Sequence, residues 1–473
     1  MQPINGLEDS RGEIRDIVFV GGGVTGTAGA MVMANYITGV KSITLLEKNS
    51  RVAMVNSGPR SNANTSHDGG TETNYSLAHA LKIQWQAWLL RHYCLLKNDP
   101  NLFWIANRMV LAVGDVEIAR LRKRYDEFLP HYPDLRLVEA EELAELEPKV
   151  MLGRNPKEKV LAMVSDQGFA INYQVLSEHM LADAQKSGVD FVTQFNTTVE
   201  FDSVRRDEDG IFVLTTVEKT EHGNVTSEIR AKVVVFAAGA YSLLFAQALG
   251  EGQDFIIFSV EGIFISVGDK LRNKVYCMQE EDFSFAEMHG DPSVFNRHNS
   301  RIGPTTKPIP FLERGNYNSV LDYFRTGILT WSGMVTIFII VFNNKMMWYV
   351  IKNYAYGFGK IGMYLFLRAA RKIIPSLKFS DLVDEGDGGV RPQIANKKTH
   401  KLIMGDSCIV GDNFIANTTP SPGASICIGN AVRDAEQVAK FLGTGYKFER
   451  QRLLQDLGVE DREIQHEVMV KAA

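Results

Sequence analysis

Three glycines near the N-terminus have the spacing of a phosphate-binding turn. Gly21, Gly23 and Gly26 form a GxGxxG pattern directly after the apolar run 17–20, and Glu47 lies 21 residues beyond Gly26. In such a pattern the first glycine permits a tight turn, the second lets the backbone approach a pyrophosphate, and the third lets a helix pack on its strand. The acid accepts hydrogen bonds from ribose hydroxyls. The pattern predicts a dinucleotide site, but by itself it does not distinguish FAD from NAD.

The elements around these glycines must form one βαβ unit of a parallel sheet. Residues 17–20 are branched and apolar, as in a strand that is buried on both faces, and residues 42–48 are a second short apolar strand ending in an acid. A helix of small residues lies between them. Its N-terminus would hold the pyrophosphate, because free N–H groups and the helix dipole favour anions.

Two later segments favour FAD over NAD. Residues 233–242 are a buried strand that runs into Ala-Gly, a pattern that recurs beneath the nucleotide in two-domain flavoproteins. Residues 418–431 are a glycine- and proline-bearing turn before a helix, whose N-terminus can stabilise negative charge on a reduced flavin. An ordinary strand end and helix cap would also explain these two segments. The predicted cofactor contacts in them are Gly239, Gly423, Ala424 and Ser425.

The composition describes a globular protein of two or three domains. The chain has 473 residues, of which 45% are hydrophobic and 23% charged. A net charge of -5 argues against nucleic acid as the main partner. The four cysteines are far apart and form no CxxC pair, so we expect no disulfide framework, no metal site and a reducing compartment.

One segment differs sharply in charge from the rest of the chain. Between Asp322 and Asp381 there is no acidic residue but eight basic ones, which leaves -13 for the remainder. The apolar stretch 327–342 would span only about 24 Å as a helix, less than the roughly 30 Å of a hydrocarbon core. Interleaved aromatic and basic residues favour a segment that lies on an anionic lipid surface. A transmembrane helix and a buried core helix are the alternatives.

Several motifs resemble the malate:quinone oxidoreductase family, in particular its epsilonproteobacterial-type branch. They are the glycine pattern, SNANTSHDGGTETNYS (61–76), FAEMHGDPSVFNRHNSRIGPTTKP (285–308), GGVRPQI (388–394) and TPSPGAS (419–425). The resemblance implies an α/β fold of the D-amino-acid-oxidase-like flavoproteins, with a Rossmann-like FAD-binding domain and an interleaved α+β substrate domain. It also implies oxidation of L-malate to oxaloacetate by FAD, with electron transfer to membrane quinone.

The implied domains are discontinuous. We expect the FAD-binding domain in residues 14–80, 160–250 and 385–445, and the substrate domain in 81–159 and 251–384. The basic and apolar segment 323–380 would face the membrane, and residues 446–473 would be a charged tail without an assigned function. The resemblance places the protein peripherally, at the cytoplasmic face of the inner membrane.

Oxidation of an alcohol by a flavin requires a base for the hydroxyl proton and cations that hold the substrate carboxylates. His67 and His289 lie in the family motifs, and either could be the base, with a slight preference for His289. Asp291 is the expected orienting carboxylate. Arg391, which follows two glycines and precedes a proline, is expected to clamp a carboxylate bidentately, through two of its guanidinium nitrogens.

The remaining candidates would bind substrate or cofactor. Arg301 or Lys307 could be a second carboxylate anchor, and Tyr75 a hydrogen-bond donor to substrate. Thr65 and Ser66, in the loop implied to pass beside the flavin, and Val199, implied to touch the adenine, complete the cofactor set. In a loop this rich in polar residues, many such groups only satisfy the backbone.

Three alternative functions remain open at this point. The substrate could be another 2-hydroxyacid, such as lactate or L-2-hydroxyglutarate. The protein could be a flavin-binding membrane module without turnover, or an NAD-dependent dehydrogenase. Reduction of a bound flavin by one of these acids would distinguish between them.

Overall fold

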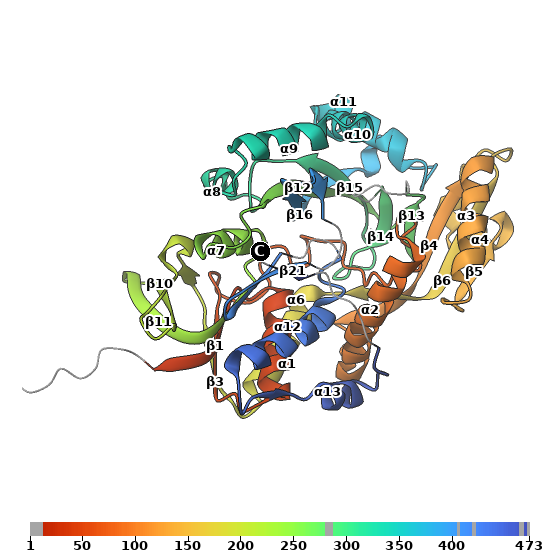
Figure 1. Cartoon of the computed structure of the whole chain (residues 1–473). Coiled ribbons are helices and arrows are strands. Elements are labelled where there is room, and N and C mark those ends of the chain that lie inside the picture. The colour runs from red at the N-terminus through yellow and green to blue at the C-terminus, as the bar shows by residue number, and fades with distance from the viewer. Residues whose placement is uncertain (1–12, 280–286, 404–406, 419–421, 463–467, 471–473) are drawn as a thin grey trace, which may run out of the picture.

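The computed structural model describes residues 13–279, 287–403, 407–418, 422–462 and 468–470. Residues 285–286 and 419–421 of the family motifs therefore lie outside the described residues. Two large sheets organise the chain, and the same segments pass repeatedly between them (Figure 1). The predicted α/β fold with an interleaved second domain is confirmed.

The first sheet contains the predicted βαβ unit. Strand β1 (Ile14–Val20) pairs in parallel with both β3 and β11, and α1 (Val24–Tyr36) connects β1 to β3. The path of this sheet is β21 (Val468–Val470), β18 (Cys408–Gly411), β19 (Phe414–Asn417), β11 (Gly223–Phe236), β1, β3 (Ser42–Leu46) and β7 (Asp190–Gln194). Strand β10 (Phe212–Thr220) pairs with β11, and β8 (Thr197–Val199) and β9 (Arg205–Arg206) pair with β10.

Helices cover one face of the first sheet (Figure 1). Helix α1 is almost wholly buried because α6 (Tyr173–Gln185) and α12 (Cys427–Leu442) pack against it. Next to α12 lie α2 (Leu77–Lys97) and α13 (Arg450–Leu457). On the other side, the short turn Gly239–Tyr241 leads into α7 (Ser242–Ala248).

Residues 446–462 and 468–470 of the predicted tail are part of this domain. Helix α13 packs on α2, and β20 (Lys447–Phe448) pairs with β2 (Ile37–Thr38). Strand β21 extends the first sheet by pairing with β18. Leu453, Leu454 and Leu457 of α13 enter the same core as α1. The composition of the tail is charged, but one apolar side of α13 is enough to hold it in place.

The second sheet forms the body of the substrate domain. Its order is β17 (Lys401–Leu402), β16 (Val383–Asn396), β12 (Phe255–Gly268), β15 (Ser300–Pro308), β14 (His289–Pro292), β13 (Lys274–Cys277), β4 (Phe103–Val113), β6 (Val160–Ile171) and β5 (Leu135–Val138). Helices α3 (Asp115–Phe128), α4 (Ala140–Leu146) and α5 (Pro148–Met151) flank its β4–β6–β5 end (Figure 1).

Two predicted domain boundaries differ from the sheet assignment. Strands β6 and β16 begin near residues 160 and 385, where we expected the chain to return to the nucleotide-binding domain. Instead, β6 pairs with β4 and β16 pairs with β12, both over most of their length. An apolar sequence pattern predicts that a segment is a strand, but it does not specify the strand with which it pairs. The long antiparallel pairing with β4 and β12 places β6 and β16 in the second sheet.

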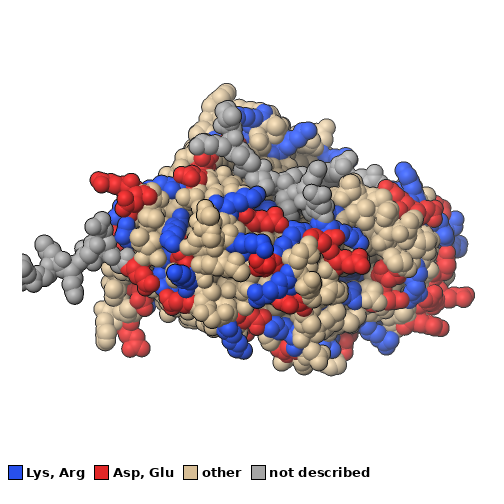
Figure 2. Space-filling view, turned by 60° about the horizontal axis from the view of Figure 1, so that its bottom comes forward, with Lys and Arg blue, Asp and Glu red and all other residues tan. Residues whose placement is uncertain are grey.

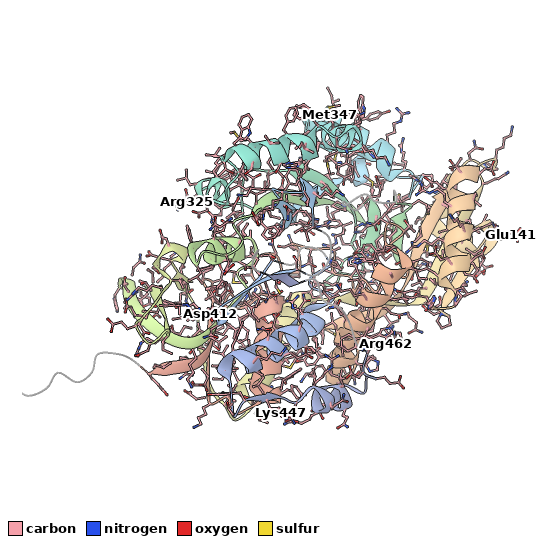
Figure 3. The ribbon with its side chains drawn as sticks, viewed as in Figure 1. Glu141, Arg325, Met347, Asp412, Lys447 and Arg462 are labelled. Carbon is pink, nitrogen blue, oxygen red and sulfur yellow. The ribbon has the colours of Figure 1, made fainter. Side chains whose placement is uncertain are left out.

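Four helices lie along the outer side of the second sheet. They are α8 (Ser319–Arg325), α9 (Trp331–Val341), α10 (Asn344–Ala355) and α11 (Gly359–Ala370). Arg325 and Met347 mark this end of the molecule in Figure 3, and Lys447 lies at the opposite end. The stretch 327–342, considered above as one helix, contains a turn followed by α9.

Within the described residues, no single helix is long and apolar enough to cross a membrane. The consecutive helices α9 and α10 meet that requirement of length and composition only together, and they are bent by 79° relative to each other.

Candidate active site

The glycine turn has the close approaches that the sequence pattern predicts. The Gly21 nitrogen donates to the Leu46 oxygen at 2.8 Å, and Gly21 has a φ of +108°. A Cβ on Gly26 would lie 2.0 Å from the Gly21 oxygen. The turn therefore requires glycine at these positions, and it leaves the backbone at Gly23 facing a cavity.

Glu47 lies directly beside this turn. Its Oε2 accepts from the Gly22 nitrogen at 2.7 Å, and its Oε1 accepts from the Asn49 nitrogen at 2.9 Å. These two bonds fix the carboxylate at the wall of the same cavity, in the position expected for ribose recognition.

A cavity of about 260 Å³ extends from the glycine turn to the second sheet. Most predicted cofactor residues line it, namely Gly23, Glu47, Thr65, Gly239, Gly423, Ala424 and Ser425. Gly21 and Gly26 shape the turn beneath it. Ser66 and Val199 do not line it: the Ser66 nitrogen donates to the Phe169 oxygen, and Val199 is packed in strand β8.

The residues around this cavity fit FAD. The cavity joins a glycine turn without Cβ atoms, a carboxylate placed for a ribose, and the N-terminal end of α12, where Ile426 provides no side-chain cap. The glycine turn can hold the phosphates, the carboxylate can bind the ribose, and the helix N-terminus can stabilise a reduced flavin ring.

Glycines before Arg391 bring the second sheet against the loop that carries His67. The Gly388 nitrogen donates to the Arg60 oxygen at 2.8 Å, and a Cβ on Gly389 would lie 2.1 Å from the Ser61 oxygen. Because of this contact, Arg391 and His67 line one cavity, although 324 residues separate them.

His67 is held by a carboxylate that the sequence analysis did not select. Its Nδ1 lies 2.8 Å from Oε1 of Glu72, whose Oε2 accepts from the Gly69 nitrogen. Burial alone would raise the pKa of Glu72, but the hydrogen bond from His67 and the charge of Arg108 lower it to about 2. An ionised Glu72 keeps a proton on Nδ1 and leaves Nε2 as the acceptor. The sequence signal that could have identified Glu72 is its position, five residues after a histidine in a polar loop.

His289 is placed differently. It is buried, does not line the cavity, and packs its ring 5.1 Å from that of Tyr276. Its Nδ1 lies 3.4 Å from the Glu287 oxygen, and its Nε2 has no hydrogen-bond partner among the described residues. Burial, together with the charges of Lys274 and Arg391, holds the pKa of His289 well below its usual value, so the imidazole is neutral.

Asp291 does not orient His289 as expected. Its Oδ2 lies 3.5 Å from the Lys274 nitrogen and 3.6 Å from Nη2 of Arg301. Strand β14 lies between β13 and β15, so cations from both neighbouring strands reach this carboxylate.

Arg391 faces the cavity without a carboxylate partner. Burial lowers the pKa of its guanidinium, and the groups that oppose this are the phenols of Tyr349 and Tyr75. Within the described part of the chain, no Asp or Glu forms an ion pair with it. A guanidinium in this state can pair with an incoming carboxylate. Tyr75 lies near Arg391 but does not line the cavity.

The two other predicted anchors do not line the cavity. Arg301 is 2% exposed, donates to Oδ1 of Asn64 at 2.7 Å, and lies over the Phe264 ring. Asn64 and Phe264 do line the cavity, so Arg301 supports its wall from behind. Lys307, at the end of β15, is absent from this wall.

Residues 16–431 match the family described as DAO, FAD dependent oxidoreductase. The chain is therefore an FAD-dependent oxidoreductase, and the predicted cofactor is confirmed. Its fold is similar to that of an L-alpha-glycerophosphate oxidase from Mycoplasma pneumoniae with FAD bound, with a TM-score of 0.60 and 19% identity over 90% of this chain and 95% of that one.

Sequence similarity narrows the class further. A probable malate:quinone oxidoreductase of Campylobacter jejuni is 36% identical over 90% of this chain and 96% of its own length. One from Helicobacter pylori is 34% identical over 95% and 99%. This chain belongs to the malate:quinone oxidoreductase family, as its motifs indicated.

Proposed function

We propose that this protein oxidises L-malate to oxaloacetate with bound FAD and passes the electrons to a quinone. The observation that supports this most directly is that Arg391 and His67, which is paired with the buried Glu72, line the same cavity as the glycine turn. The first can bind a carboxylate and the second can remove a proton, which are the two requirements of 2-hydroxyacid oxidation.

His67 is the base in this proposal, rather than His289. Bound FAD would supply the acceptor for the hydride at C2 of the substrate. Arg391 binds a substrate carboxylate and so fixes the position of the hydroxyl. Nε2 of His67 takes the hydroxyl proton, and the ionised Glu72 stabilises the imidazolium that forms. His289, buried and neutral, supports the wall of the site.

The helices α8–α11 form a surface suited to lipid, and we infer that the protein is peripheral at the cytoplasmic face of a membrane. Trp331, Trp348 and Phe358 are 79%, 68% and 70% exposed. Such a group of exposed apolar residues on a soluble surface marks an interaction site. The exposed bases Lys345, Lys360 and Arg368 on these helices complement anionic headgroups. On the face shown in Figure 2, by contrast, acidic and basic side chains are interspersed.

Anaerobic reduction of the bound flavin tests the substrate. Purified holoprotein is mixed with L-malate, L-lactate or L-2-hydroxyglutarate, and the loss of flavin absorbance is followed. We expect rapid loss with L-malate. Loss with L-lactate alone would refute the malate assignment, and loss with none of the acids would refute the proposed oxidation.

A further inference from the structure

A buried lysine lies directly behind the cavity wall, and the mechanism above makes no use of it. Lys274 begins strand β13, and its side chain is 6% exposed. Its nitrogen donates to the Ala63 oxygen at 3.2 Å and to the Thr65 hydroxyl. Ala63 and Thr65 both line the cavity. The ammonium therefore holds two cavity-lining groups from behind.

The start of β13 is fixed independently. The carboxyl group of Glu147 accepts from the backbone nitrogens of Arg272 and Asn273 at 3.1 and 2.8 Å. Parallel pairing with β4 places Lys274 opposite Arg108. The position of the lysine thus follows from backbone contacts and does not depend on its own charge.

Charged groups on three neighbouring segments face Lys274. Asp291 of β14 lies 3.5 Å away and Arg301 of β15 shares that carboxylate, while Glu72 acts from the loop. On its own strand the Tyr276 ring lies 5.3 Å away, and His289 of β14 is a further neighbour. Asp291 is thus shared by two buried cations, of which Arg301 also lies 3.9 Å from Oδ2 of Asp387.

We propose that Lys274 is a positioning residue that holds the Ala63–Thr65 wall and keeps the cavity electropositive. Its positive charge then stabilises the negative charge that bound FAD gains on reduction. A preorganised buried cation is an effective stabiliser, because it needs no reorganisation when the charge arrives. The proposal rests on FAD occupying this cavity, but it does not depend on malate being the substrate.

The charge of this lysine is sensitive to pH. Burial and the charge of Arg301 lower the pKa of Lys274 to about 8, against the pull of Asp291. The group is an ammonium below that pH and an amine above it. The stabilisation of reduced FAD should therefore be present at pH 7 and decline above about pH 8.

The midpoint potential of bound FAD, measured without substrate, tests the proposal. We expect Lys274→Met to shift the potential to a more negative value at pH 7. Wild-type protein should show an additional negative shift above about pH 8, and Lys274→Arg should lack it because arginine stays charged. Lys270→Met removes a partly exposed lysine four residues away and should leave the potential unchanged.

Two results would overturn the proposal. One is a potential of Lys274→Met equal to that of wild type at pH 7. The other is an identical pH dependence in wild type and Lys274→Arg. If Lys274→Met does not fold because Asp291 is left unpaired, the comparison of wild type with Lys274→Arg still tests the proposal. A protein that fails to oxidise malate but shows these shifts would refute only the substrate assignment.

Discussion

At the scale of single residues, the different environments of His67 and His289 identify His67 as the proposed base. His67 lines the cavity and has a carboxylate on Nδ1, whereas His289 is buried behind the wall. We expect His67→Gln to slow anaerobic flavin reduction by L-malate about 10²- to 10⁴-fold, the usual contribution of a general base. Stopped-flow absorbance measures this rate.

His289→Gln is the matched variant, and it should slow flavin reduction much less. A rate that falls with His289→Gln but not with His67→Gln would assign the proton transfer to His289. Both variants should retain FAD, because neither side chain holds the glycine turn.

Arg391 permits a second prediction at this scale. Its guanidinium has no carboxylate partner, so a substrate carboxylate would supply one. Hydrogen bonds to charged groups contribute roughly 1.5–3 kcal/mol, so Arg391→Ala should raise the KM for malate about 10- to 100-fold while FAD stays bound. Steady-state kinetics with a soluble electron acceptor measure the change.

Lys307→Ala serves as the control, because Lys307 is also basic but does not line the cavity. Its KM should match that of wild type. An unchanged KM in Arg391→Ala would remove Arg391 from the substrate site.

At the scale of secondary-structure elements, helices α9–α11 present bases and aromatic rings together. Each basic residue near an anionic surface contributes about 1 kcal/mol. Replacing the exposed bases Lys345, Lys360 and Arg368 with glutamine should therefore weaken binding to anionic vesicles by roughly 3 kcal/mol at low salt. Co-sedimentation measures this binding, and the difference from wild type should shrink as salt screens the charges.

The control is a triple replacement of exposed lysines just after α6, in α12 and in β20, namely Lys186, Lys440 and Lys447. Lys447 lies at the end of the molecule opposite Met347 (Figure 3). It removes the same charge and should leave vesicle binding intact. Equal losses in both triple variants would mean that net charge, rather than this surface, attracts the protein to lipid.

At the scale of the whole molecule, the two sheets meet around one cavity, and the chain must cross between them to build it. The first sheet supplies the glycine turn and Glu47, and the second supplies Arg391. The loop that carries Thr65 and His67 lies between them, held by the contact of Gly389 with Ser61. The site therefore exists only when both sheets are in place.

The sequence alone determined the βαβ unit, the dinucleotide turn and the family. Strand periodicity, glycine spacing and motifs are properties of residues close together in the sequence, so they can be recognised without knowledge of the fold. Arg391 and His67 could also be selected, because an arginine that stands two residues after a glycine pair and directly before a proline, and a histidine in a polar loop, are locally unusual.

Only the tertiary structure decided how these residues are used. It gave His67 its carboxylate partner Glu72, moved Asp291 from His289 to Lys274, and placed β6 and β16 in the second sheet. Each of these depends on which strands pair and which side chains are buried together. These long-range contacts depend on packing and desolvation over the whole chain, so a local sequence pattern does not predict them.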